Sequence, residues 1–339
     1  MASHAGDQAS GLRNAPVARR RVLAALASLP VLPATAQAQR AFPERPVRLV
    51  VPYGAGSATD TLTRQLSAVM SSSLGQPVVV DNRPGASTIV AAEHVARSAP
   101  DGYTLIVAVD QTMCFNPVLF PQRLPYDPAR DFTAVAGLTA HPLMPVVSPG
   151  LPVRSVPELV ALAKAQPGRI SFASPGIASA AHLVTEVFQR EAGIEMTHVP
   201  YNNVGQMLAD LLTGTVQVLF YPYQQLKPHL EAGRVRPLAN PTMSRAMIPG
   251  LPTMPELGYP RSVIAPWVAI YAPTGTPDDR IARLSEAARL ALDNQEIRAS
   301  LTDVGIEVRY RSPADLAAFT VAEAGSCREL IAISGARID

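Results

Sequence analysis

Two kinds of apolar pattern alternate along most of this 339-residue chain: short continuous apolar runs, and apolar residues at helical spacing. Short apolar runs are typical of buried strands, and apolar residues three and four positions apart are typical of amphipathic helices. The expected strands are Val47–Val51, Val78–Val80, Tyr103–Val109, Leu143–Val147, Ile170–Ala173, His198–Pro200, Val216–Phe220 and Val268–Ala272. The expected helices include Thr59–Ser72, Ile89–Ser98, Val156–Gln166, Ser179–Ala192, Gly205–Thr213 and Pro277–Asp293. This alternation predicts an α/β fold whose mixed, largely parallel sheets are flanked by helices, with ligands bound where strands end and helices begin.

The N-terminal segment 1–38 has the features of a secretory signal peptide. Arg19–Arg21 precede an apolar run from Val22 to Leu32, and the small residues of Ala36–Ala38 follow as a cleavage signal. We therefore expect a periplasmic protein that is cleaved near Ala38. The apolar run is too short to span a membrane, and the choice between general secretory and twin-arginine export stays open.

Charge and size limit the classes of partner. The whole chain has a net charge of +2 and the leader has a net charge of +3, so the rest of the chain carries about −1. A nearly neutral chain is not expected to bind nucleic acid or an anionic membrane. The roughly 300 remaining residues exceed the usual size of one core, which predicts two lobes. Cys114 is expected in a polar loop and Cys327 in a C-terminal helix, and the sequence leaves open whether they pair.

An apolar run, a glycine-rich turn and a helix start follow one another between Leu49 and Asp60. The free backbone N–H groups at a helix start, together with the positive end of the helix dipole, can bind a carboxylate or a phosphate. Glycine also lets the backbone approach a ligand closely. The ligand-binding residues expected here are Tyr53, Gly54, Ala55, Gly56, Ser57, Ala58, Thr59 and Asp60. The alternative is that Ser57 to Asp60 only cap the helix.

A second turn of the same type lies between Ile170 and Leu183. The ligand-binding residues expected in it are Ser174, Gly176, Ala178, Ser179 and His182. Two helix-start anion sites in different halves of the chain predict a clamp around a small anion. The alternative is that the two serines are plain caps and that His182 is an ordinary half-buried helix residue.

Several motifs resemble the Bug family, the extracytoplasmic receptors of tripartite tricarboxylate transporters. They occur in order and with fitting spacings over nearly the whole mature chain. The matching segments are Phe42–Val47, Val51–Asp60, Asp81–Ala86, Ala99–Leu105, Leu124–Phe132, His198–Tyr201, Pro228–Gly233 and Ala272–Pro277.

The resemblance implies a two-lobed, flytrap-like periplasmic-binding-protein fold of type II, with a ligand cleft between the lobes. Lobe 1 would comprise residues 39–145 and 242–339, and lobe 2 residues 146–241. It also implies a monomer that binds a small-molecule carboxylate without a cofactor or metal and delivers it to the membrane permease subunits of a tripartite tricarboxylate-type transporter.

The sequence departs from the family pattern at positions that select the ligand. Ser87, Thr88 and Ile89 stand where the family typically has Gly-Gly-Asn, and Tyr221 follows a strand where the family often has Asp. A tyrosine cannot pair with the ammonium group of an amino-acid ligand. We therefore expect an aromatic or other non-amino carboxylate, with Ser87, Thr88, Tyr201 and Tyr221 added to the ligand-binding residues.

Two other classes of function compete with a transport receptor. A ligand-sensing receptor for a sensor kinase would close in the same way, and nothing in the chain separates it from a transport receptor. An exported hydrolase is disfavoured, because the sequence contains neither a His-Glu-x-x-His pattern nor a Gly-x-Ser-x-Gly elbow. We expect no enzymatic activity.

Overall fold

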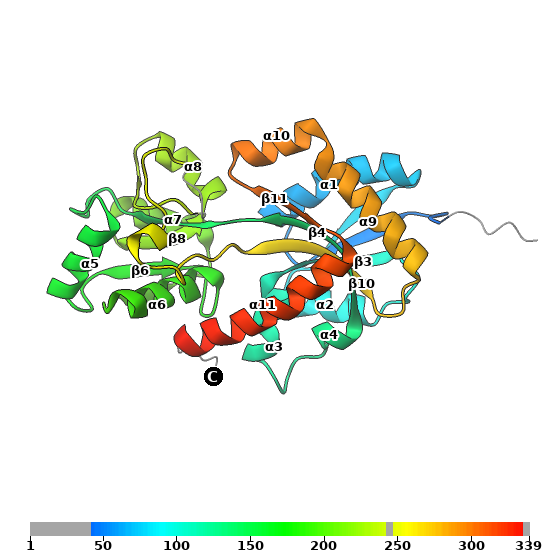
Figure 1. Ribbon diagram of the computed structural model, residues 1–339, viewed down its shortest axis with the longest axis horizontal. Helices are drawn as coiled ribbons and strands as arrows, with labels where there is room; N and C mark the ends of the chain where they lie inside the picture. The colour runs from blue at the N-terminus through cyan, green and yellow to red at the C-terminus, as the bar shows by residue number, and fades with distance from the viewer. Residues whose placement is uncertain (1–41, 242–246, 335–339) are drawn as a thin grey trace, which may run out of the picture. The chain divides into compact units, whose positions relative to one another are not determined.

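Two mixed β-sheets flanked by helices make up residues 42–241 and 247–334, the part of the chain that this computed structural model describes (Figure 1). Both sheets belong to one compact unit. The predicted signal peptide lies outside the described residues. Within them, no helix is both long and apolar enough to cross a membrane.

The larger sheet combines strands from both ends of the chain. Its strand order is β11-β4-β10-β3-β1-β2. The strands are β1 (Val47–Val51), β2 (Val78–Asn82), β3 (Thr104–Val109), β4 (Phe132–Ala140), β10 (Trp267–Pro273) and β11 (Glu307–Arg311). β1 runs parallel to β2 and β3, whereas β10 is antiparallel to β3 and β4, and β11 is antiparallel to β4. The parallel half therefore directs the carboxyl ends of β1, β2 and β3 to one edge.

The second sheet is built from one continuous stretch of chain. Its strand order is β7-β6-β8-β5-β9. The strands are β5 (Leu143–Val147), β6 (Ser171–Ser174), β7 (Thr197–Pro200), β8 (Val218–Pro222) and β9 (Arg236–Pro237). β6 is parallel to β7 and β8, while β5 is antiparallel to β8 and β9.

Helices cover both sheets. Around the larger sheet lie α1 (Ala58–Leu74), η1 (Ala86–Thr88), α2 (Ile89–Ala96), η2 (Gln111–Phe115), α3 (Asn116–Leu119), α4 (Pro128–Asp131), α9 (Asp278–Asp293), α10 (Gln295–Asp303) and α11 (Pro313–Ser334). The second sheet carries α5 (Val156–Ala165), α6 (Ala180–Ala192), α7 (Val204–Thr213) and α8 (Tyr223–Glu231), and η3 (Pro255–Leu257) precedes β10. The apolar face of α1, which includes Leu62, Leu66 and Met70, is buried in the core on one side of the larger sheet.

Two chain segments connect the sheets and are hydrogen-bonded to each other. His141 N–H donates to the Pro266 carbonyl at 2.7 Å, and Leu143 N–H donates to the Ile264 carbonyl at 3.1 Å. A third connection is α11, which packs on β4 and η2 of the first half and on α6 of the second (Figure 1). These three elements link the two halves of the structure.

The structure confirms the predicted α/β class and corrects some details. The largely parallel pairing holds for the part of each sheet that carries the candidate loops. β4, β9 and β11 lay in no predicted strand. The assignment of Cys114 to a polar loop was wrong, because it is buried within η2.

Candidate functional site

The first candidate loop joins the carboxyl end of β1 to the start of α1. Ser57 is the N-cap of α1, and its side chain accepts from Asp60 N–H at 3.2 Å. Gly54, Ala55 and Gly56 are exposed, and Gly56 has a φ of 82° that suits glycine. The capping interpretation is therefore correct for Ser57, and the turn before it presents its backbone to solvent.

Asp60 holds this loop in place. Its carboxylate is 2% exposed and accepts from Gly56 N–H at 2.9 Å, Arg64 Nε at 2.9 Å and Asn82 Nδ2 at 2.9 Å. Asn82 Nδ2 also donates to the Tyr53 carbonyl at 3.0 Å. The Arg64 guanidinium, followed by the bonds from Gly56 and Asn82, lowers the pKa of Asp60 to about 2. Asp60 thus holds this turn as an ionised group and has both of its oxygens engaged within the protein.

A left-handed turn lies beside this loop, at the start of α2. Ala86, Ser87 and Thr88 have φ values of 43°, 51° and 75°. Such consecutive left-handed residues carry backbone strain that persists only where surrounding contacts hold it. Asn116 Nδ2 donates to the Ser87 carbonyl at 2.7 Å, and Thr112 Oγ1 donates to Thr88 Oγ1 at 3.0 Å. The side chain of Thr88 is therefore used inside the protein, while Ser87 is exposed.

The second candidate loop joins β6 to α6 in the other sheet. Ser179 is the N-cap of α6, accepts from His182 N–H at 3.3 Å and donates to the Gly176 carbonyl at 2.8 Å. Ser174 is fully buried, and its hydroxyl donates to the Gly176 carbonyl at 2.8 Å. Ala178 is held at a φ of 59°, a left-handed conformation for a residue with a Cβ.

Two stacked imidazoles, those of His182 and His198, contact the second loop. The rings of His182 and His198 are 4.0 Å apart, and Phe172 stacks on His198 at 4.8 Å. His182 Nδ1 accepts from Ala178 N–H at 3.0 Å, which requires that nitrogen to be unprotonated. Burial, followed by the neighbouring His198, lowers the pKa of His182 to about 4, and burial lowers the pKa of His198 as well. The loop is therefore organised by neutral groups at pH 7.

Tyr53, Asp110 and Tyr221 are close enough to interact electrostatically where the two halves meet. Burial raises the pKa of Tyr53, and Asp110 and Tyr221 raise it further. Asp110 follows β3, and its burial raises its pKa to about 7. Tyr221, on β8 of the second sheet, is 8% exposed, and burial raises its pKa to about 12. Neutral phenols and one carboxyl that titrates near pH 7 therefore share this region.

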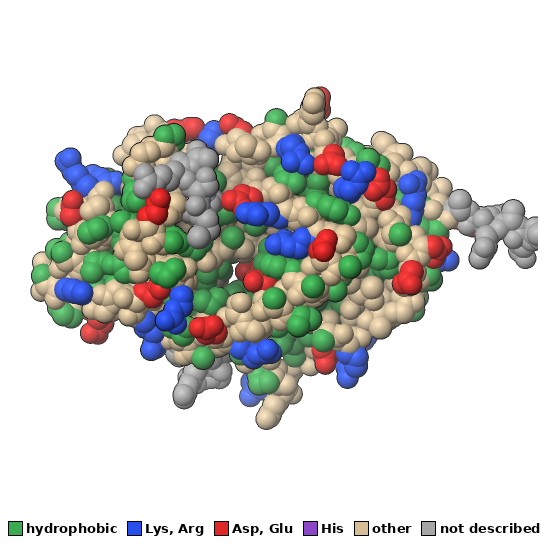
Figure 2. Space-filling model, in the orientation of Figure 1, with side chains coloured by type: hydrophobic (Ala, Val, Ile, Leu, Met, Phe, Trp, Pro, Cys, Tyr) green, Lys and Arg blue, Asp and Glu red, His purple; other side chains and the backbone are tan. Residues whose placement is uncertain are grey.

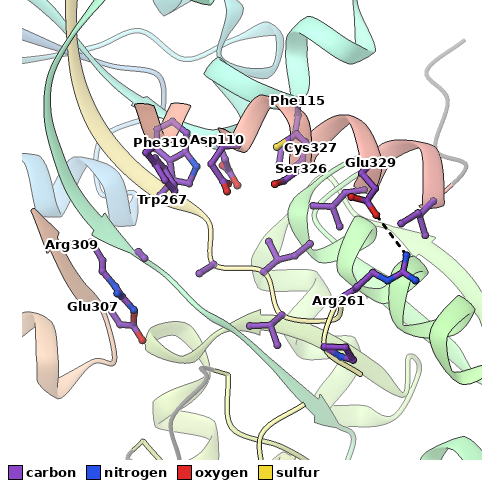
Figure 3. A pocket seen from close by; sticks show the side chains of 18 of the residues that line it. Asp110, Phe115, Arg261, Trp267, Glu307, Arg309, Phe319, Ser326, Cys327 and Glu329 are labelled. Atoms are coloured by element: carbon purple, nitrogen blue, oxygen red, sulfur yellow. Dashed lines mark hydrogen bonds and ion pairs between the residues drawn. The ribbon is translucent and has the colours of Figure 1, made fainter. Parts of the chain in front are cut away.

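Two cavities border the contact between the halves. One, of about 500 Å³, is lined by side chains from the connecting segment, β11 and α11, together with Asp110 after β3 and Trp267 at the start of β10 (Figure 3). Figure 2 shows a hollow at this place with charged side chains at its rim. The other, of about 240 Å³, lies at the start of α1 and includes Ala58 and Gln224.

The structure groups the predicted residues into three neighbourhoods. Residues 53–60, 87–88 and 174–182 lie at the carboxyl ends of β1, β2 and β6 respectively. Tyr221 shares the Tyr53 region, whereas the Tyr201 hydroxyl donates to Asp210 at 2.7 Å and is thereby engaged within its own half. The ligand-binding role of these residues remains a prediction.

Sequence reasoning missed several groups that shape the loops, namely Asn82, Asp110, Asn116 and His198. For Asp110 a signal was present, because it directly follows an apolar run at the edge where ligands bind. Asn82 and His198 lay within recognised motifs, but their partners are distant in sequence. No cluster of at least three His, Cys, Asp or Glu side chains suited to a metal occurs in the described segments 42–241 and 247–334.

The chain is similar in sequence to a protein family and to several known proteins. Residues 62–335 match the model of the tripartite tricarboxylate transporter family receptor. The protein BugT of Bordetella pertussis is 33% identical over 298 residues, which cover 88% of this chain and 91% of that protein. A protein encoded in the tcbD-tcbE intergenic region of Pseudomonas sp. strain P51 is 33% identical and covers 94% of this chain and 95% of its own.

Solved structures show the same fold. Rpa4515 of R. palustris, determined with adipate, has a TM-score of 0.79 and 35% identity and covers 88% of this chain and 100% of its own. MatC of Rhodopseudomonas palustris, with bound malate, has a TM-score of 0.74 and 33% identity and covers 86% of this chain and 100% of its own. The mixed α/β fold is therefore that of a periplasmic binding protein. The chain belongs to the Bug family of tripartite tricarboxylate transporter receptors.

Proposed function

We propose that this protein is a periplasmic solute receptor that holds a small carboxylate between its two halves, with the helix starts after β1 and β6 supplying N–H donors from opposite sides. The observation that carries the proposal is the pair of strand-to-helix loops, one in each sheet, whose N-caps are Ser57 and Ser179. A carboxylate held by neutral donors needs no cationic side chain at the site. The proposed lobes are residues 39–145 with 242–339, and residues 146–241.

The proposed ligand is a carboxylate without an ammonium group, and an aromatic acid or a dicarboxylate fits best. Tyr53 and Tyr221 offer ring faces and protonated hydroxyls, because burial raises the pKa of both. Asp60, the acidic residue in the first loop, is 2% exposed, and both of its oxygens already accept hydrogen bonds within the protein, which disfavours a bond to a ligand ammonium. Relatives with adipate and malate support a dicarboxylate among the candidates.

Delivery to the permease subunits of a tripartite transporter is proposed from family membership, and the receptor is proposed to act as a monomer. We propose no catalysis, and the surroundings of the Ser174 side chain support this. Ser174 Oγ lies 2.7 Å from His198 Nε2, but Ser174 is fully buried, and its oxygen also contacts the Gly176 carbonyl and accepts from Gly176 N–H. A nucleophilic serine needs an exposed oxygen whose proton the histidine can accept.

A matched pair of substitutions tests the binding site. Ala55→Glu places a negative charge at the exposed turn before α1, while Ala161→Glu places the same charge on the exposed face of α5. We expect A55E to weaken carboxylate binding at least tenfold by repulsion and A161E to leave it unchanged. Titration calorimetry with adipate, malate, benzoate and glutamate measures this. Equal affinities in both variants would overturn the site, and tight glutamate binding would overturn the ligand class.

A further inference from the structure

The two cysteines of the chain are far apart in sequence, yet both are buried as free thiols in one hydrophobic cluster. Cys114 lies in η2, directly after β3, and is 1% exposed. Cys327 lies in α11 and is 2% exposed. Both belong to the same hydrophobic cluster, in which α11 packs against η2. The thiols therefore sit on two elements that are already in contact.

The surroundings of the two thiols are apolar on one side and acidic on the other. Cys114 is the largest cause of the raised pKa of Cys327, followed by burial, Asp110 and Glu323. Figure 3 shows the Cys327 sulfur beside Phe115 on the face of α11 that lines the larger cavity. The sequence holds no third cysteine, so neither thiol has another intramolecular partner.

We propose that Cys114 and Cys327 form a disulfide bond in the mature protein and thereby attach α11 to the end of β3. The two thiols lose two protons and two electrons, and the oxidant is a disulfide such as oxidised glutathione. One thiolate attacks that disulfide and releases one glutathione thiol. The second cysteine then displaces the other, so one S–S bond forms and one breaks. The predicted export to the periplasm supplies an oxidising compartment.

The environment also determines when the bond forms. Thiolates are the attacking species, and the buried, acidic surroundings of Cys327 disfavour its thiolate in the folded chain. The bond therefore forms while the chain folds, before α11 closes over η2. Once both sulfurs are buried, an external reductant reaches them slowly.

The bond would constrain a part of the fold that touches both halves. α11 contacts β4 and η2 in the first half and α6 in the second. Arg261 and Glu329 form an ion pair at 3.7 Å between the connecting segment and this helix (Figure 3). A bond between Cys327 and Cys114 would therefore attach α11 to η2 in the first half, while the same helix also contacts α6 in the second half.

Mass spectrometry after refolding tests the bond directly. The unfolded chain is refolded in a buffer of reduced and oxidised glutathione, quenched with N-ethylmaleimide under denaturing conditions and weighed intact. We expect no maleimide adduct before reduction, two adducts after reduction, and one linked peptide pair that contains both cysteines. Two adducts without reduction, or stable glutathione adducts, would overturn the proposal.

Stability and timing provide two further measurements. Because the bond closes a loop of about 210 residues, the oxidised chain should melt roughly 5–10 °C above the reduced chain. A Cys114→Ser and Cys327→Ser double variant should show no dependence on reductant, and a shift of equal size in that variant would contradict the proposal. Reduced protein that is already folded should oxidise at least tenfold more slowly than refolding protein, and equal rates would contradict the proposed order of events.

Discussion

The loops after β1 and β6 present the same kind of helix start, but different chemistry holds each one. In the first, an ionised and buried Asp60 binds Gly56 N–H, Arg64 and Asn82. In the second, a neutral His182 accepts from Ala178 N–H while Ser179 caps the helix. The two loops therefore respond to different pH ranges, because the pKa of Asp60 is lowered to about 2 whereas the pKa of His182 is about 4.

The largest expected change in stability comes from removing the Asp60 carboxylate in the loop after β1. Asp60→Ala should lower the free energy of unfolding by about 3 kcal/mol, because it leaves buried donors without an acceptor. Arg64→Ala should cost about 0.5 kcal/mol, because Arg64 is 53% exposed. Urea unfolding of both variants measures the difference. Equal losses would show that the ion pair, and not the buried bonds to Gly56 and Asn82, holds this loop.

A pH titration should separate the two loops. The pKa of His182 is about 4 in the folded chain and 6.5 when unfolded, so its stabilising contribution is present above pH 6.5 and is lost as the pH falls toward 4. Relative to His182→Gln, the wild type should lose about 1–2 kcal/mol between pH 7 and pH 5. In NMR spectra, the Ala178 amide should titrate with His182, whereas the Gly56 amide should stay constant to below pH 4. An Ala178 amide that does not respond would remove the proposed role of Nδ1.

The smallest expected effects come from the helix caps. Ser57→Ala and Ser179→Ala should each cost about 1 kcal/mol of stability, with Ser179 the larger because its hydroxyl also donates to Gly176. Ser155 caps the outer helix α5 and provides the control. S155A should lower stability by an amount similar to S57A and leave carboxylate affinity unchanged, whereas S57A and S179A should lower both. Unchanged affinity in the two loop variants would separate capping from ligand binding.

The sequence predicted the strands that carry both loops because their residues are consecutive and β-branched or apolar. β4 escaped prediction because its sequence is rich in small residues, and it is identified as a strand by pairing on both sides with β10 and β11. β11 escaped because its sequence alternates charged residues at the edge of the sheet. In both segments the run of apolar residues was too short to predict a strand from the sequence.

The candidate site was predictable in its loops and not in its supports. Ser57 and Ser179 were identifiable because a cap is a local pattern. Asp110 and His198 depend on residues that are distant in sequence, such as Tyr53 for the first and Ser174 for the second. Cys114 was assigned to a loop because polar residues surround it in the sequence. These polar residues are accommodated in the interior, because Thr112 and Asn116 both donate to Thr88 Oγ1.

The strand orders of the two sheets also determine the sequence in which an emerging chain can assemble. The second sheet uses one continuous stretch from β5 to β9, so it is complete once residue 237 has appeared. The larger sheet places β10 between β3 and β4, and β10 begins only at Trp267. Until that strand arrives, β3 and β4 both have an unpaired edge, which is a site for wrong pairing. A chain interrupted between these two points would hold one finished sheet beside one open sheet, and its unpaired strand edges would make it the form most prone to aggregate.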